Sequence, residues 1–359
     1  MEHPVVFHNL RKATESKLLF PIIALAIILL FDLIFIPNFF QVSYQQGHLY
    51  GSLIDILRNS MPVVALAIGM TFVIATGGID LSVGATMAIV SSVAALLINP
   101  FITGTQLTGI QNDPAFSNSP FWLVILLPLL VSIFCGLWNG TLVAYGKIQP
   151  MVATLILMIS GRGIAQLITN SQKILIFYKP FLYIGHGWLV LPFAFFIVVA
   201  LFIIAWLISR KTSIGLFIES VGANPRSSMF SGIDEKKVKL FAYIFCGFCA
   251  GVAGLIETSN ITTCDASNLG MNMELDAILA VVIGGTMMSG GRYSLMASAI
   301  GGLAMQAVTT TMYAVGVSAN SLLAVKGVVV ILIILLYSQQ VKDLMRRIFI
   351  THKVKETRS

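Results

Sequence analysis

Ten long apolar runs constrain this chain more than any other feature of its sequence. A helix needs about 20 mostly apolar residues to cross a membrane. The runs cover residues 18–36, 54–76, 81–98, 121–145, 150–170, 188–209, 238–257, 273–289, 295–314 and 320–338. They predict an all-α polytopic membrane protein with about ten transmembrane helices, some of them broken, in a single domain over residues 1–359. The eighth run is the weakest, because Glu274 and Asp276 open it and glycines close it.

The composition excludes an ordinary soluble domain. Only 10% of the residues are charged and 57% are hydrophobic, whereas soluble domains carry about 25% charged residues. The net charge of +7 could indicate a nucleic-acid partner, but the basic residues lie at the ends of the apolar runs. We therefore expect contact with membrane lipid and none with nucleic acid. The first run is too long for the apolar core of a cleavable signal peptide and is expected to be the first spanning helix.

The basic residues predict the orientation in the membrane. Ten crossings put both termini on one side, and all but five of the 22 Lys and Arg residues then lie on that side. The five exceptions are Arg58, Arg162, Lys173, Lys179 and Lys326. Because basic residues concentrate on the cytoplasmic side, we expect cytoplasmic termini, a cytoplasmic loop at about 210–237 and a basic cytoplasmic tail at 339–359. Segments 99–120 and 172–188 are then external loops, the first a surface insertion.

Small residues inside the apolar runs predict close helix packing. Gly136-x-x-x-Gly140 and Gly247-x-x-x-Gly251 are spacings that let two helices approach closely, and we expect them to pack the chain's own helices. Cys135, Cys246 and Cys249 also fall in apolar runs and are expected to be packing residues. Cys264 is the one cysteine expected near the external side, with no evident partner for a disulfide.

The longest polar interruption, residues 210–239, has the pattern of two short helices. Apolar residues from Ile214 to Val221 recur at helical spacing, Gly222 is expected to end the first helix, and Asn224-Pro225 restarts the chain. A second helix follows and stops at Gly232. The pattern alone fits a docking surface or a solvated connection equally well.

This segment carries a family resemblance. VGANPRSSMFSGI is similar to the cytoplasmic coupling segment in the permease subunits of bacterial monosaccharide ABC importers, the ribose, arabinose and galactose group. The resemblance implies that the loop seats in a cleft of a separate ATPase, with Ile218 and Val221 buried in the contact. The implied coupling residues are Glu219, Gly222, Asn224, Pro225, Arg226, Ser227 and Gly232.

The stretch ATGGIDLSVG, residues 75–84, resembles a signature of the same permeases. Gly77 and Gly78 break a helix, and Asp80 and Ser82 follow where the next helix begins. One interpretation is capping of that helix, since an acidic side chain stabilises a helix start. The other is a broken helix, extending to Gly84, that lines a polar pathway, because irregular backbone in a membrane is tolerated beside a water-filled cavity.

A third stretch, MELDAILAVVIGGTMMSGGR at residues 273–292, is similar to the family's ELDAIAAVVIGGTSLSGG pattern. Glu274 and Asp276 are expected in the first turn of a helix, where carboxylates complement the dipole. The glycine pairs are expected breaks with a gating role: Gly284, Gly285, Gly290 and Gly291.

Polar residues inside the runs are candidates for a substrate pathway. Arg162 and Gln166 share a helix face, although hydrogen bonding between neighbouring helices explains them equally well. Asp32 and Glu257 are expected to reach water from the outer ends of their spans, whereas Lys326 either does the same or pairs internally. The candidate pathway set is Thr76, Asp80, Ser82, Asn139, Arg162, Gln166, Glu274 and Asp276.

The resemblance covers nearly the whole chain and implies a type II-like ABC importer permease in the bacterial inner membrane. Residues 54–76 and KIQPMVATLILMISGRGIAQLIT resemble permeases of galactofuranose importers most closely. Implied partners are a dissimilar sister permease, a cytoplasmic ABC ATPase and a periplasmic sugar-binding protein. No G-x-x-x-x-G-K-[ST] phosphate loop is present, so ATP and Mg would be used by the ATPase, and this chain is expected to bind no cofactor and to be no enzyme. The alternatives are a self-powered secondary transporter, which needs ion-coupling carboxylates at mid-membrane, and an intramembrane enzyme, which needs a convergent catalytic set.

Overall fold

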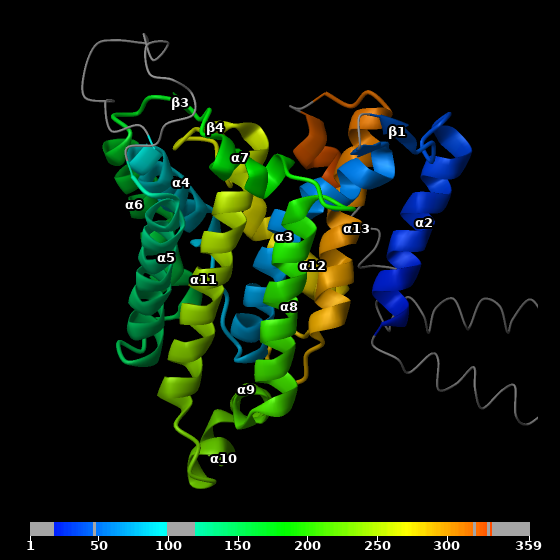
Figure 1. Ribbon diagram of the computed structural model, residues 1–359. Coiled ribbons are helices and arrows are strands. Elements are labelled where there is room, and N and C mark those ends of the chain that lie inside the picture. The colour runs from blue at the N-terminus through cyan, green and yellow to red at the C-terminus, as the bar shows by residue number, and fades with distance from the viewer. Residues whose placement is uncertain (1–17, 46–47, 99–118, 319–320, 329–330, 332–359) are drawn as a thin grey trace, which may run out of the picture.

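The computed structural model describes residues 18–45, 48–98, 119–318, 321–328 and 331, and they form a bundle of helices with roughly parallel axes (Figure 1). The helices are α2 (Leu19–Phe35), α3 (Ser52–Ala75), α4 (Val83–Ile98), α5 (Phe121–Ala144), α6 (Pro150–Ile168), α7 (Lys179–His186), α8 (Phe193–Lys211), α9 (Ser213–Ala223), α10 (Pro225–Phe230), α11 (Glu235–Ile261), α12 (Met273–Ile283) and α13 (Leu295–Ala314). Six of them, α3, α5, α6, α8, α11 and α13, are long and apolar enough to cross a membrane. The prediction of an all-α polytopic membrane protein is confirmed.

One predicted span is shorter in the structure than expected. The run 273–289 gives only the 11-residue helix α12, because Gly284 and the left-handed Gly285, with φ of 76°, turn the chain out of the helix. Of the run 320–338, residues 321–328 are helical. The tail 339–359 and most of the predicted insertion 99–120 lie outside the described residues.

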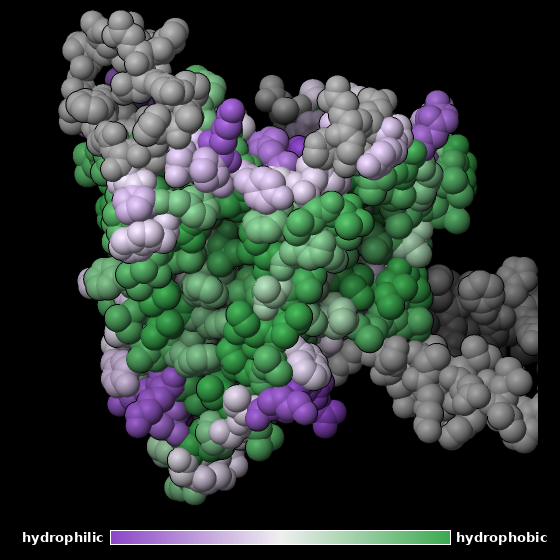
Figure 2. All heavy atoms as spheres, viewed as in Figure 1, coloured by the Kyte–Doolittle hydropathy of each residue, from purple (hydrophilic) through white to green (hydrophobic). Residues whose placement is uncertain are grey.

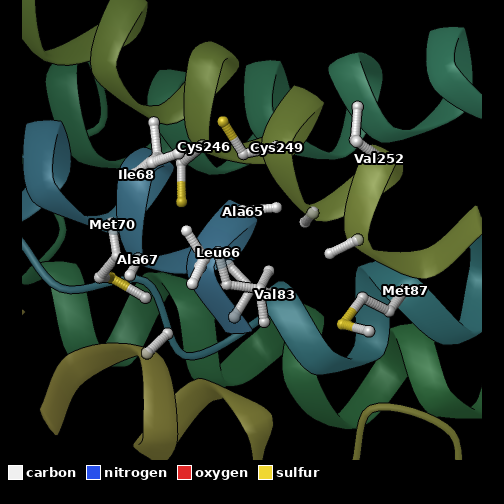
Figure 3. Packing of buried hydrophobic residues seen from close by; sticks show 14 of the residues in the cluster. Ala65, Leu66, Ala67, Ile68, Met70, Val83, Met87, Cys246, Cys249 and Val252 are labelled. Atoms are coloured by element: carbon white, nitrogen blue, oxygen red, sulfur yellow. The ribbon is translucent and has the colours of Figure 1, made fainter. Parts of the chain in front are cut away.

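Helix α3 forms the centre of the bundle. Every residue from Ser60 to Ala75 is buried, as expected for a helix that is apolar all round. Ala65, Leu66 and Ile68 of α3 face Cys246 and Cys249 of α11 (Figure 3). All four cysteines are free and buried, and a Cβ on Gly69 would lie 2.8 Å from that of Cys249. Cys246 and Cys249 are therefore small packing residues, as predicted.

The glycine spacings hold α5 against α11. A Cβ built on Gly136 would lie 3.2 Å from the Cα of Gly247, and one on Gly140 would lie 2.8 Å from the side chain of Leu240. Gly251 packs against Ser132 in the same crossing. The prediction that these glycines pack the chain's own helices is confirmed, because their missing side chains let the two backbones meet.

A wide apolar band crosses the face of the bundle shown in Figure 2, with hydrophilic residues at its two ends. One end carries α9 and α10, and we call it the α10 end (Figure 1). The opposite end, which we call the β4 end, carries two small ladders: β1 (Ser43–Gln45) pairs with β2 (His48–Tyr50), and β3 (Ile174–Leu175) pairs with β4 (Thr263–Cys264), both antiparallel. A band of apolar side chains between two polar ends is the surface of a membrane-spanning protein.

The segment 172–188 is more ordered than the predicted external loop. It contains β3 and the helix α7, so it is not an irregular loop, while its external placement stays a prediction. Helix α7 starts with Pro180 in its first turn and buries Phe181 and Ile184. Ser259 of α11 fixes it, accepting from the amide of Gly185 at 2.8 Å and donating to the Phe181 carbonyl at 3.0 Å.

Candidate functional site: a glycine junction at the α10 end

The three glycine-containing stretches singled out in the sequence meet at one point. The amide of Gly291 donates a 2.9 Å hydrogen bond to the carbonyl oxygen of Ala75, the last residue of α3. Gly222 of α9 lies against both groups, and a Cβ built there would overlap the Ala75 oxygen and the Gly291 nitrogen. A Cβ on Gly290 would lie 2.9 Å from the carbonyl oxygen of Gly222 and from the amide nitrogen of Gly77. We call these five residues the glycine junction.

Backbone conformation also requires glycine here. Gly77, Gly290 and Gly291 have φ angles of 78°, 90° and 100°, a region that residues with a Cβ rarely adopt. The predicted breaks at Gly77, Gly290 and Gly291 are therefore real turns, and they are in contact with one another. The predicted break at Gly84 was wrong, because Gly84 lies within helix α4.

Gly222, however, does not end a helix. Helix α9 runs to Ala223 and is followed by Asn224, whose amide donates to the Ser220 carbonyl at 3.0 Å. The Asn224 side chain then caps α10 by accepting from the amide of Ser227 at 3.1 Å. Gly232, with φ of 80°, follows the second helix. The glycine at 222 is needed for its contact with α3, not for a local turn.

Aromatic and hydroxyl contacts fix the junction to its neighbours. The Tyr293 hydroxyl lies 2.7 Å from that of Ser209 at the end of α8. The Tyr293 ring meets Phe72 of α3 edge-on, with ring centroids 5.6 Å apart. Close-packed interiors transmit displacement rather than absorb it. A shift of α9 would therefore reach α3 and the segment between α12 and α13 directly.

Helices α9 and α10 expose three large apolar side chains among polar ones. Leu216, Met229 and Phe230 are 67%, 61% and 87% exposed, beyond the apolar band of the bundle. Ile218 and Val221 are fully buried within this chain, so the expectation that they contact a partner was wrong. Of the other implied coupling residues, Asn224, Arg226 and Ser227 are exposed, whereas Glu219 and Pro225 are half-buried.

Three candidate pathway residues form a buried cluster. The Asp80 carboxylate accepts from the amide and the hydroxyl of Ser82 at 2.9 and 2.7 Å. The Asn139 amide of α5 donates to the Ser82 hydroxyl at 2.7 Å and to Asp80 at 3.3 Å. All three are almost inaccessible to solvent. Asp80 thus binds the residue before α4 and a neighbouring helix, while the Ser82 carbonyl accepts from Thr86 as the helix begins.

Arg162 and Gln166 hold the segment that follows β4. The Arg162 guanidinium donates to the carbonyls of Leu269 and Ala266 at 2.6 and 3.4 Å, and Gln166 donates to the Ser267 hydroxyl at 3.1 Å. Arg162 and Gln166 therefore form hydrogen bonds to a neighbouring segment, which was the alternative to a role in a substrate pathway.

Asp265 organises the same segment. Partial burial raises the pKa of its carboxyl, but bonds from Asn268, Lys173 and two backbone amides outweigh it and lower the pKa to about 2. Lys173 approaches to 2.9 Å.

The other polar residues within the apolar runs each make separate contacts. Lys326 pairs internally, with its ammonium 2.6 Å from the Asp276 carboxylate. Glu274 is buried against Gly84, and Thr76 bonds to the Val73 carbonyl at 2.8 Å. Asp32 is fully buried beside Thr311, so the expectation that it reaches water was wrong.

A polar group at the β4 end escaped the sequence reasoning. Arg58 of α3 interacts electrostatically with Glu257 of α11 and with His186 of α7, and Asn260 lies beside Glu257. The i, i+3 spacing of Glu257 and Asn260 was a usable signal. A second signal was the positive charge of Arg58, which lies inside the apolar run 54–76. In the part of the chain that the structure describes, no group of three or more His, Cys, Asp or Glu residues could hold a metal ion.

Comparisons with known proteins agree with this architecture. Residues 52–336 match the family model described as the permease component of the branched-chain amino acid transport system. The galactofuranose transporter permease protein of Escherichia coli K12 is 44% identical over 327 residues, covering 90% of this chain and 91% of that protein. A fructose import permease of Bifidobacterium longum is 34% identical, covering 93% and 91%, and the ribose import permease of E. coli K12 is 31% identical, covering 83% and 87%.

No solved structure matches the chain significantly. The family match extends from the start of α3 into the last apolar run, and so includes every element of the glycine junction. The relatives are transport subunits rather than enzymes. The chain is similar to sugar import permeases for galactofuranose, fructose and ribose. It therefore belongs to this family of transport permease components.

Proposed function

We propose that the chain is the membrane permease of an ABC importer that carries a monosaccharide, of galactofuranose or galactose type, across the bacterial inner membrane. The observation that carries the proposal is the glycine junction beneath an exposed apolar surface. Leu216, Met229 and Phe230 offer a contact for a separate ATPase, and the same helix pair touches α3 and the α12–α13 segment.

The proposed mechanism follows from these contacts. ATP binding closes the ATPase pair and moves α9 and α10. Gly222 passes the movement to Ala75 and Gly291, because no side chain separates the three backbones. Access to the pathway then alternates between the two sides. We also propose that both termini and the α10 end lie in the cytoplasm.

The polar path keeps the predicted set Thr76, Asp80, Ser82, Asn139, Arg162, Gln166, Glu274 and Asp276. It gains Arg58, Glu257 and Asn260 at the β4 end, where sugar would enter from a periplasmic binding protein. Hydrogen-bonding side chains of this kind suit sugar hydroxyls, which both donate and accept. The importer would also need a second permease, which we propose to be a dissimilar sister chain. Identity of 44% to a galactofuranose permease supports the choice of sugar.

Reconstitution tests the proposal. The permease, its sister, the ATPase and the binding protein are placed in proteoliposomes, and uptake of labelled galactofuranose, galactose, ribose and fructose is measured. We expect uptake that needs both ATP and the ATPase chain. Uptake by the permeases alone, driven by an ion gradient, would support a secondary transporter instead.

A further inference from the structure

A cavity of about 400 Å³ opens at the α10 end, between the α5–α6 connection and the start of α11. Its lining is Val143, Ala144, Lys147, Ile148, Gln149, Pro150, Glu235, Lys236 and Lys239. We call it the basic pocket. No residue of the glycine junction lines it, and the proposed transport mechanism makes no use of it.

The pocket carries a positive charge that the described residues neutralise only in part. Glu235 pairs with Lys239 at 2.5 Å. Lys147 and Lys236 form no ion pair with any described residue, and Lys236 lies 5.6 Å over the ring of Tyr145. Two lysines therefore remain for an anion.

The backbone holds Lys147 in place. Its φ of 54° is left-handed, which is uncommon for a residue with a side chain. Bonds from Gly146 to the Thr141 carbonyl at 3.0 Å and from Ile148 to the Leu142 carbonyl at 3.2 Å fix the turn on both sides. The ammonium is thus presented from an ordered connection rather than from a free loop.

An apolar track leads from the pocket along α5. Leu130, Phe134 and Trp138 are exposed at helical spacing, and Tyr145 continues the same face at the rim of the pocket. Trp and Tyr favour the level of lipid headgroups. Figure 2 shows hydrophilic atoms gathered at the α10 end directly beneath the apolar band.

We propose that the basic pocket binds the phosphate of an anionic phospholipid, whose acyl chains lie along the exposed face of α5. Basic pockets between membrane helices bind such headgroups. At about 30 Å³ per water, a volume of about 400 Å³ accommodates a phosphoglycerol group. A free phosphate has the same chemistry, but it would gain nothing from the apolar track.

The experiment uses the full-length permease, purified in detergent, and native mass spectrometry. Phosphatidylglycerol and phosphatidylcholine are titrated separately, and bound lipid is counted. We expect tighter binding of phosphatidylglycerol, weakened about tenfold or more in Lys147→Gln/Lys236→Gln, since each juxtamembrane lysine contributes to anionic lipid binding. The matched control is Lys211→Gln/Lys237→Gln, which removes two exposed lysines of the same end that do not line the pocket. It should bind like the wild type.

Three results would overturn the proposal. The first is unchanged phosphatidylglycerol binding in the pocket variant, with normal thermal stability showing that it is folded. The second is displacement of the lipid by inorganic phosphate at equal concentration, which would assign the pocket to a free anion. The third is loss of ATPase copurification with lipid binding intact, which would make the pocket part of the ATPase contact. Since the lipid measurement needs neither ATPase nor sugar, its failure is distinguishable from failure of the proposed function.

Discussion

The Gly291 amide donates a hydrogen bond of 2.9 Å to the carbonyl oxygen of Ala75. The last carbonyls of a helix have no partner within it, so α3 obtains one for its final residue from the segment after α12. Gly222 of α9 packs against this bond. Main-chain atoms thereby couple the helix pair α9 and α10 to the breaks at Gly77 and at Gly290 and Gly291.

Replacing Gly222 tests that coupling. Because a Cβ would overlap the Ala75 oxygen, Gly222→Ala and Gly222→Val should displace α9 in order of size, with overpacking costs of about 1–3 kcal/mol. In proteoliposomes we expect sugar-stimulated ATP hydrolysis to fall about tenfold or more in Gly222→Val, with membrane insertion intact. Gly163→Ala is the control, because nothing lies within 4 Å of its added Cβ. Normal turnover in Gly222→Val would remove the junction from the mechanism.

The exposed apolar surface of α10 should bind the ATPase. Met229→Asp/Phe230→Asp places two carboxylates where apolar side chains are exposed, so burying them at an interface becomes costly. Copurification of the ATPase with the tagged permease should fall at least tenfold. Met271→Asp, an exposed apolar position away from α9 and α10, should copurify like the wild type. Equal recovery from both variants would contradict the assigned surface.

Reversing the charges of Glu219 and Arg226 tests how α9 and α10 are oriented against the ATPase rather than how tightly they bind it. Electrostatic complementarity sets partner choice and orientation more than it sets binding strength. We expect Glu219→Lys/Arg226→Glu to retain some ATPase while losing sugar-stimulated turnover. ATP hydrolysis and copurification are measured on the same preparation. A variant that loses neither would show that these charges do not orient the contact.

Cysteine labelling tests the orientation of the bundle. All four native cysteines are buried, so background labelling by a membrane-impermeant maleimide should be low. In intact spheroplasts, Gln172→Cys at the β4 end should react, whereas Ser213→Cys and Ser227→Cys should react only after permeabilisation. All three positions are exposed. External labelling of Ser227→Cys would reverse the topology and exclude the ATPase contact.

Asp265 should make the segment after β4 sensitive to acid. Its pKa of about 2 lies below the ordinary value of about 3.9 for an unfolded chain. The stabilisation is therefore complete above that ordinary value and is lost as the pH falls through about 2. Asp265→Asn should raise hydrogen exchange at the amides of Ser267 and Asn268 at neutral pH, because both bond to its carboxylate. Protection equal to that of the wild type would exclude this role.

Much of the fold follows from local sequence. The apolar runs fix where helices form, since a helix in a membrane satisfies its own backbone hydrogen bonds. Asn224-Pro225 likewise sets the start of α10 through a side-chain cap and a ring that fits the first turn. The glycine pairs at 77–78 and 290–291 were recognisable as breaks, because glycine tolerates positive φ.

What the sequence could not decide depends on contacts between distant segments. The sequence predicted a helix end at Gly222, but glycine is needed there because the backbone of Ala75 packs against it. Helix α7 is too short and too mixed in character to be recognised alone, and its apolar face is stabilised by the bundle it covers. Ile218, Val221 and Asp32 are buried because particular helices of this chain cover them. The sequence by itself determined where the long apolar helices form and that Gly77, Gly290 and Gly291 break the chain. Only the tertiary structure decided which breaks meet, because spacing along one helix carries no information about the helix packed against it.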